Sequence, residues 1–303
     1  MAHDRLKFFK QWMPRPGRGS LSAADFESRE VLIAVKRAVF ERINVDRRAH
    51  GLGPVGYDRL AAEVGEAHCR EMLVHGYVSH WNMQGLKPYH RLSFAGGADG
   101  VSENCSGAEA SQAIYHSVDD VIEGVLESHA AMLGEAPPND GHRRTILNPA
   151  NTHVGIGLAF NARGMRMTQE FLQRYVEITS TPPASLRLDE QFLLRGRVLS
   201  PALRVRSIAV YFEPHPRPLG LGELQRTGSY GFPSEVDYEY PVLPPGRRYS
   251  GGNTGTVVVG RGGEFRCPLN FKRGRAGLHT VCVWIEGAGG SSVPATSLTL
   301  RVG

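Results

Sequence analysis

Two histidines, one glutamate and one glutamine are the residues whose types and order could do chemistry. His80 and Glu103 lie in loop-like runs, His142 opens the run GHRRTILNP, and Gln169 lies in MTQEF. Two imidazoles and a carboxylate are the minimum set for a divalent metal site with an open coordination position. The same three side chains could also transfer protons. The sequence has neither an HExxH helix nor a GxSxG turn, so no standard catalytic motif assigns their roles.

The stretch 141–160 must position this group. Pro149 biases Asn148 away from helical angles. The chain then alternates large apolar and small residues from 154 to 160, which predicts a half-buried strand. Gly155 and Gly157 leave one face of that strand without side chains, so we expect a packed element or a ligand to approach it closely. We therefore expect the site at the mouth of this strand.

Composition limits the function classes. The chain has 303 residues, 41% of them hydrophobic and 21% charged, which is enough for two globular domains. The net charge of +5 is carried by scattered arginines, without a basic stripe or stacking aromatics. No run reaches the roughly 20 apolar residues of a membrane span. We therefore expect neither nucleic-acid binding nor a transmembrane segment.

The first 27 residues show no periodicity and include Pro14, Pro16 and Gly17, which predicts an arm. The N-terminus has charges but no apolar core, so it is not an intact signal peptide. Either the protein remains inside the cell, or a signal peptide has already been removed.

Residues 28–180 read as helices around a short antiparallel sheet. Apolar residues at spacings of three and four predict a helix over 28–49. Asp58 and Ser117 are suitable N-caps for a second and a third helix. A turn at 161–164 should return the chain as a second strand that runs to about residue 178. This pattern predicts a three-layer α+β domain.

Composition changes at 180–185 (STPPAS), which looks like a linker. From 186 to 303 the chain has no long amphipathic helix. Short alternating runs separated by glycine and proline predict an all-β sandwich; these runs are FLLRGRVL, RSIAVYF, TGTVVVG, EFRCPLNF, LHTVCVWI and TSLTLRV.

Four cysteines are present and none forms a CxxC pair, so a structural zinc site is not expected. A hairpin that joins the runs around Cys267 and Cys282 would place these two residues opposite each other, within reach of a disulfide. The alternative is a pair of small buried thiols. Cys69 and Cys105 should be structural whether paired or not.

Four motifs occur in order and at suitable spacing: SHWNMQGLKPYHR, SENCSG, GHRRTILNP with HVGIG, and MTQEF. Together they resemble the CAP superfamily (cysteine-rich secretory, antigen 5 and pathogenesis-related proteins), in particular its bacterial SCP-like branch, over about residues 28–180. The part after 186 resembles no family that we recognise.

The resemblance implies an α–β–α sandwich with a central cleft that has two histidines and two acidic residues. His80 and Glu103 match the first histidine and the first acid of the family pattern. His142 matches the histidine of the bacterial GHR motif, whereas Arg166 stands where eukaryotic members have their second cleft histidine. Either Glu127 or Glu135 could supply the second acid.

The resemblance favours an extracellular or periplasmic protein, and the strand glycines together with the lack of a defined nucleophile favour binding over catalysis. We expect a cleft formed by His80, Glu103, His142, Gln169 and Glu127 that holds a small molecule, a lipid or a divalent cation, with His80 and His142 as ligands of Zn²⁺ or a similar ion. The β-sandwich would recognise a cell-surface or protein partner. A metal-dependent hydrolase that uses His80, Glu103 and His142 and a purely structural interaction protein are the alternatives.

Overall fold

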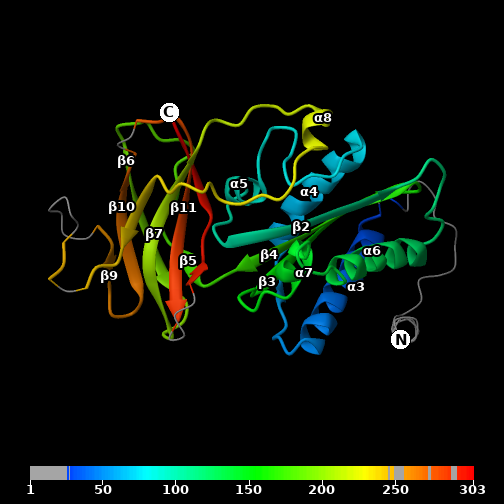
Figure 1. Ribbon diagram of the computed structural model, residues 1–303, viewed down its shortest axis with the longest axis horizontal. Helices are drawn as coiled ribbons and strands as arrows, with labels where there is room; N and C mark the ends of the chain where they lie inside the picture. The colour runs from blue at the N-terminus through cyan, green and yellow to red at the C-terminus, as the bar shows by residue number, and fades with distance from the viewer. Residues whose placement is uncertain (1–25, 27, 245, 249–255, 272–273, 288–291) are drawn as a thin grey trace.

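The computed structural model describes residues 26, 28–244, 246–248, 256–271, 274–287 and 292–303. The arm expected at 1–27 lies outside these residues, apart from Phe26. Figure 1 shows a helix-rich part and a β-rich part side by side. Among the described residues, no helix has the length and apolar character that a membrane crossing requires.

Within the described ranges, five helices form the helix-rich part, and the expected caps start two of them. α3 (Arg29–Ala49) and α4 (Arg59–His75) are the first two predicted helices, and the Asp58 carboxylate accepts the Ala61 N–H at 2.7 Å. α6 (Val118–Leu133) begins with a capping box between Ser117 and Asp120. Two short helices, α5 (Pro88–Phe94) and α7 (Gly141–Ile146), carry parts of the sequence motifs.

The sheet of this part has the order β1-β3-β4-β2, and its strands are β1 (Gly56–Tyr57), β2 (Gly100–Glu109), β3 (His153–Asn161) and β4 (Gly164–Gln173). The β3–β4 hairpin was predicted. The interpretation of GVSENCSG as a turn-rich loop was wrong, because this run pairs with β4 along its whole length and forms the edge strand β2.

Helices cover both faces of this sheet, so the predicted α–β–α layers are confirmed. One face packs Ile156 and Met167 against Val39 of α3 and Val125 of α6. The other face lies against α4, where Gly155 and Gly157 leave room for its backbone. The close approach predicted from these two glycines is therefore made by a packed helix.

The β-rich part is a sandwich of two sheets. One has the order β5-β6-β10-β9, and in the other β11 lies beside β7, β12 and β13, with β8 on the far side of β7. Their apolar faces share one core that includes Leu194, Leu269, Val210 and Val283. Its strands are β5 (Val176–Ile178), β6 (Gln191–Val198), β7 (Leu203–Glu213), β8 (Tyr238–Pro241), β9 (Val258–Val259), β10 (Glu264–Asn270), β11 (Gly277–Gly287), β12 (Ser292–Pro294) and β13 (Leu298–Val302).

The six alternating runs correspond to β6, β7, β9, β10, β11 and β13. The return strand of the first sheet is shorter than expected. β4 ends at Gln173, and Val176–Ile178 leaves to pair with β6 on the other side of the linker-like stretch 180–185.

The hairpin predicted to join Cys267 and Cys282 was wrong. β10, which holds Cys267, pairs with β6, whereas β11, which holds Cys282, pairs with β7 in the opposite sheet. Each strand buries an apolar face in the sandwich, so the chain crosses between the sheets after β10. All four cysteines are buried free thiols, as the alternative interpretation expected for this pair.

The two parts contact each other through polar and apolar groups. Glu213 at the end of β7 accepts hydrogen bonds from Lys87 Nζ and Tyr89 Oη, both at 2.6 Å. The chain after β7 then crosses the helix-rich part and forms the short helix α8 (Leu221–Leu224) above α4, as Figure 1 shows. Leu224 is fully buried against a cluster that includes Cys69 and Met72. We call residues 214–232 the crossing segment.

Candidate functional site

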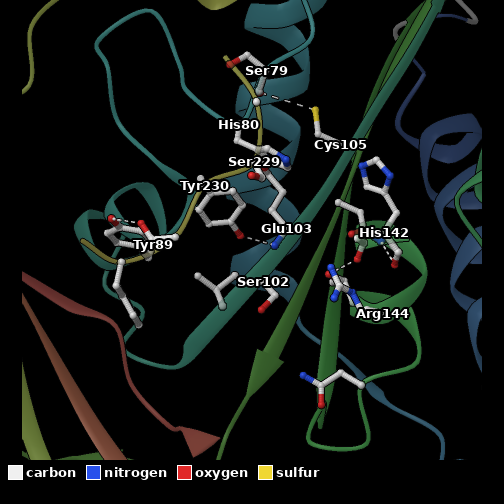
Figure 2. A pocket seen from close by; sticks show the side chains of 18 of the residues that line it. Ser79, His80, Tyr89, Ser102, Glu103, Cys105, His142, Arg144, Ser229 and Tyr230 are labelled. Carbon is white, nitrogen blue, oxygen red and sulfur yellow. Dashed lines mark hydrogen bonds and ion pairs between the residues drawn. The ribbon is translucent and has the colours of Figure 1, made fainter. Parts of the chain in front are cut away.

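A cleft of about 790 Å³ runs along the edge strand β2. His80 and Glu103 lie on one side of it and His142 on the other, so three of the predicted site residues line a single space. Figure 2 shows the two histidines on opposite sides of β2. Glu135 lines the cleft as well.

The first polar pair is formed by His80 and Glu103. His80 Nδ1 lies 2.7 Å from Glu103 Oε1, and Arg91 donates to Glu103 Oε2 at 2.5 Å. Burial and the nearby Arg91 charge lower the pKa of His80 to about 4. The imidazole is therefore neutral near pH 7, Nδ1–H donates to the carboxylate, and Nε2 remains as an acceptor.

A buried acid that the sequence analysis did not single out supports this pair. Glu170 lies directly across from Glu103 in the β2–β4 ladder. Burial, then the neighbouring Glu103 charge, raises the pKa of Glu170 well above its ordinary value. Burial also raises the pKa of Glu103, against the effect of Arg91. Two adjacent buried carboxyls hold one proton between them, and Arg91 places it on Glu170.

The second polar pair is formed by His142 and Glu135. His142 is the second residue of α7, and its Nδ1 lies 2.5 Å from Glu135 Oε1. The His142 N–H donates to Glu135 Oε2 at 2.9 Å. Burial tends to raise the pKa of Glu135, but these hydrogen bonds outweigh it and leave the pKa below its ordinary value. Glu135 thus holds the imidazole at the edge of the cleft.

Two of the residues expected in the cleft lie elsewhere. Gln169 is fully buried on the face of β4 that packs against α6, where its Nε2 lies 3.0 Å from His129 Nδ1. Glu170, the next residue, takes the opposite face because strand residues alternate. Glu127 is exposed on α6. Glu135 follows the end of α6 and is the acidic residue that reaches the cleft.

Arg166 does not take the place of a cleft histidine either. It is buried on the α4 face, where its Nε donates to the Tyr77 carbonyl at 2.9 Å and its guanidinium pairs with Glu109. Its role is structural, because it links β4 to the chain after α4.

Tyr230, near the end of the crossing segment, completes the cleft. Its hydroxyl accepts the Glu103 N–H at 2.5 Å, and its ring centroid lies 4.6 Å from that of His80. Figure 2 shows Tyr230 directed toward Glu103. Thr227 of the same segment shares a hydrogen bond with Ser79 at 2.6 Å. The β-rich part therefore contributes to a site that the sequence analysis placed wholly in residues 28–180.

The two cleft histidines have part of the arrangement that a metal ion requires. Both histidines use Nδ1 toward a carboxylate, which is the arrangement of metal-ligating histidines. Over the described part of the chain, however, no three His, Cys, Asp or Glu side chains come together in a group that could hold an ion. The side chains as arranged therefore do not form a complete metal site.

Comparison with known proteins gives one matching family. The model of the CAP family (cysteine-rich secretory protein family) matches residues 40–171. Two curated proteins of Bacillus subtilis (strain 168) are similar. The uncharacterized protein YkwD is 24% identical over 139 residues, which is 46% of this chain and 47% of that protein. The uncharacterized membrane protein YlbC is 28% identical over 186 residues, which is 57% of this chain and 46% of that protein. The chain spans about half the length of these curated relatives.

Two solved structures are also similar in part. An extracellular protein containing an SCP domain from Bacillus anthracis has a TM-score of 0.40 and 21% identity, and the match covers 52% of this chain and 45% of that one. An outer surface protein from Borrelia burgdorferi has a TM-score of 0.38 and 13% identity, with 46% of this chain and 93% of that one covered.

Proposed function

Because residues 40–171 form a domain of the CAP family, we propose that the protein is an extracytoplasmic binding protein that holds a small polar ligand in the cleft along β2. One observation carries the proposal. His80 and His142 line the same cleft from opposite sides, and each has its Nδ1 held by a carboxylate. Their Nε2 atoms are thus pre-oriented polar contacts, and pre-orientation lowers the entropy cost of binding.

The groups around the histidines favour binding over catalysis. Cys105 lines the cleft, but burial raises the pKa of its thiol well above the ordinary value, so it is a poor nucleophile. Ser79 uses its hydroxyl toward Thr227. A metal-dependent hydrolase would need a third ligand beside His80 and His142, and the described residues do not provide one.

The helix-rich part and the β-rich part would have separate roles. Residues 28–180 would provide the cleft, and the sandwich of residues 186–303 would dock on a cell-surface or protein partner. Location outside the cytoplasm agrees with the description of the matching family, which names secretory proteins. The buried cysteines tolerate such a location, because burial raises their pKa values and so lowers the reactive thiolate fraction.

Ligand binding is tested by thermal unfolding of the full chain at pH 7.5 with a panel of amino acids, dicarboxylates, monosaccharides and nucleotides, and separately with Zn²⁺. A stabilising compound should lose its effect in both His80→Ala and His142→Ala. His75→Ala, which changes an exposed histidine of α4, is the matched control. Retention of the full effect in both cleft variants would place binding elsewhere. A Zn²⁺ effect that needs both histidines, without an effect of any organic compound, would replace this proposal with a cation site.

A further inference from the structure

The floor of the cleft is a strand edge rather than a set of side chains alone. β2 is the last strand in the order β1-β3-β4-β2, so among the described residues one of its edges has no neighbouring strand within that sheet. Six consecutive residues of β2, 100–105, line the cleft. A strand edge offers a row of N–H and C=O groups that a second extended chain can pair with.

The direction of these backbone groups follows from the ladder. The Ala110 N–H donates to the Arg163 carbonyl, one step beyond the end of the β2–β4 pairing. From Val101 to Glu109, even-numbered residues of β2 therefore face β4, and odd-numbered residues face the open edge. The Glu103 N–H agrees with this rule, because it points away from β4 and donates to the Tyr230 hydroxyl. The N–H and C=O groups of Val101, Glu103 and Cys105 thus face the cleft.

The open part of the edge has a defined start. Where the strand begins, the Gly100 N–H donates to the Ala295 carbonyl at 3.1 Å, and Asp99 forms an isolated bridge with Thr296. Beyond that point, the backbone groups of Val101 and Cys105 make no hydrogen bond outside the sheet to any described residue. Proteins usually block such edges against pairing with other sheets. Here the cleft of about 790 Å³ runs along the edge, with His80 and His142 on its two sides (Figure 2).

We propose that the ligand is an extended peptide segment that adds to β2 between Val101 and Cys105. This inference rests on the proposed function of the cleft as a binding site, and it makes the ligand a short peptide rather than a single small molecule. Four residue steps of β2 span about 13 Å, so five peptide residues are the minimum. Backbone pairing supplies the affinity, and alternate peptide side chains meet the two walls, with His80 on one and His142 on the other.

Tyr230 regulates this edge. Its hydroxyl accepts the Glu103 N–H, which is the central group of the open stretch, so an incoming peptide carbonyl must displace it. Tyr230→Phe frees that N–H and should strengthen peptide binding by about 2- to 10-fold, the size of one net hydrogen bond. A small polar ligand that Tyr230 contacts directly would instead bind more weakly to this variant. The sign of the change therefore separates the two ligand classes.

The probe is an equimolar library of acetylated, amidated hexapeptides built from Ser, Thr, Val and Asn, and its counterpart is the same library with every backbone nitrogen methylated. Both are titrated into the full chain, and exchange of the Val101 and Cys105 amides is followed by NMR. The first library should bind and slow both amides, and the methylated library should bind at least about 10-fold more weakly. Tyr57→Phe, on β1, serves as the control for Tyr230→Phe.

Equal binding of both libraries, or unchanged exchange at Val101 and Cys105, would overturn edge pairing. If the library binding seen in that case is lost in His142→Ala, the cleft remains a binding site, and only the proposal of backbone pairing with an extended peptide is wrong. Failure of both libraries to bind overturns the peptide proposal, and the panel of small molecules then decides on the proposed function independently.

Discussion

Gly157 of β3 and Gly65 of α4 lie so close that their backbones are in contact. A Cβ atom on Gly157 would lie 2.3 Å from the Gly65 carbonyl carbon, which is backbone and has no room to move aside. The distance between α4 and the sheet, and with it the position of the loop that carries His80, therefore depends on the absence of a side chain at residue 157.

Gly157→Ala should lower the free energy of unfolding by about 1–3 kcal/mol or more, because the added methyl group must push α4 away from the sheet. Urea denaturation measures this change. Gly141→Ala is the matched control, since a Cβ at residue 141 meets no atom within 4 Å. Equal stabilities of the two variants would show that α4 does not pack this closely in solution.

The protonated Glu170 predicts an unusual dependence of stability on pH. Its folded-state pKa is raised, so its contribution to stability is full below the unfolded pKa of about 4.5 and is lost as the pH rises toward the folded value. A glutamine at this position would keep a donor for Glu103 but would not titrate. Glu170→Gln should therefore gain stability relative to the natural chain as the pH rises from 5 to 8.

Urea denaturation of both proteins at pH 5 and pH 8 tests the Glu170 prediction. The difference in free energy of unfolding should grow with pH in favour of the variant. A difference that stays constant, or that shrinks, would mean that Glu170 is ionised in the folded protein.

Local signals were enough for much of the fold and for part of the site. The capping residues Asp58 and Ser117 and the helical spacing of apolar residues located three helices, and ordered motifs brought His80, Glu103 and His142 to one cleft. Side chains alternate between the two faces of a strand, and Met165, Met167 and Phe171 share the apolar face with Gln169. This alternation would have shown that Gln169 and Glu170 face opposite sides of the sheet.

Other features depend on contacts between distant parts of the chain. Tyr230 meets Glu103 across 127 positions, and nothing in the run GSYGF predicts that contact. The hairpin that would place Cys267 opposite Cys282 required a local turn, but burial of an apolar face on each strand places them in different sheets. Sequence spacing describes local pairing well, whereas a crossing between sheets is decided by the whole core.

Glu213 joins the two parts through charge. The Glu213 carboxyl group is mostly buried, and burial raises its pKa. Interactions with His90, Lys87 and Tyr89 outweigh burial and lower the pKa to about 2. Because this value lies below the ordinary 4.5, the stabilisation is full above about pH 4.5 and is lost as the pH falls through about 2. Glu213→Gln should therefore cost roughly 3 kcal/mol at pH 7 and much less near pH 2.5.

Urea denaturation at pH 7 and pH 2.5 measures the Glu213 effect. Glu177→Gln is the control, because Glu177 and Arg197 form an exposed pair, and such pairs contribute about 0–1 kcal/mol. A Glu213→Gln effect as small as that of the control would mean that the two parts are not joined by this carboxylate.

Leu224 anchors the crossing segment that brings Tyr230 to the cleft. Its side chain is fully buried in a cluster with Cys69 and Met72 of α4, whereas Leu221 in the same short helix is 42% exposed. Leu224→Ala should lower the free energy of unfolding by about 2–5 kcal/mol, because it removes packing that holds the segment against α4, and Leu221→Ala should change it by less than about 0.5 kcal/mol.

Because Tyr230 protects the Glu103 N–H, Leu224→Ala should also speed exchange of that amide, while amides of the β3–β4 hairpin exchange at closer to their natural rates. NMR-detected exchange measures both. If the Glu103 amide exchanges equally in the two leucine variants, the crossing segment is not held by Leu224, and the position of Tyr230 must depend on Thr227 and Ser79 instead.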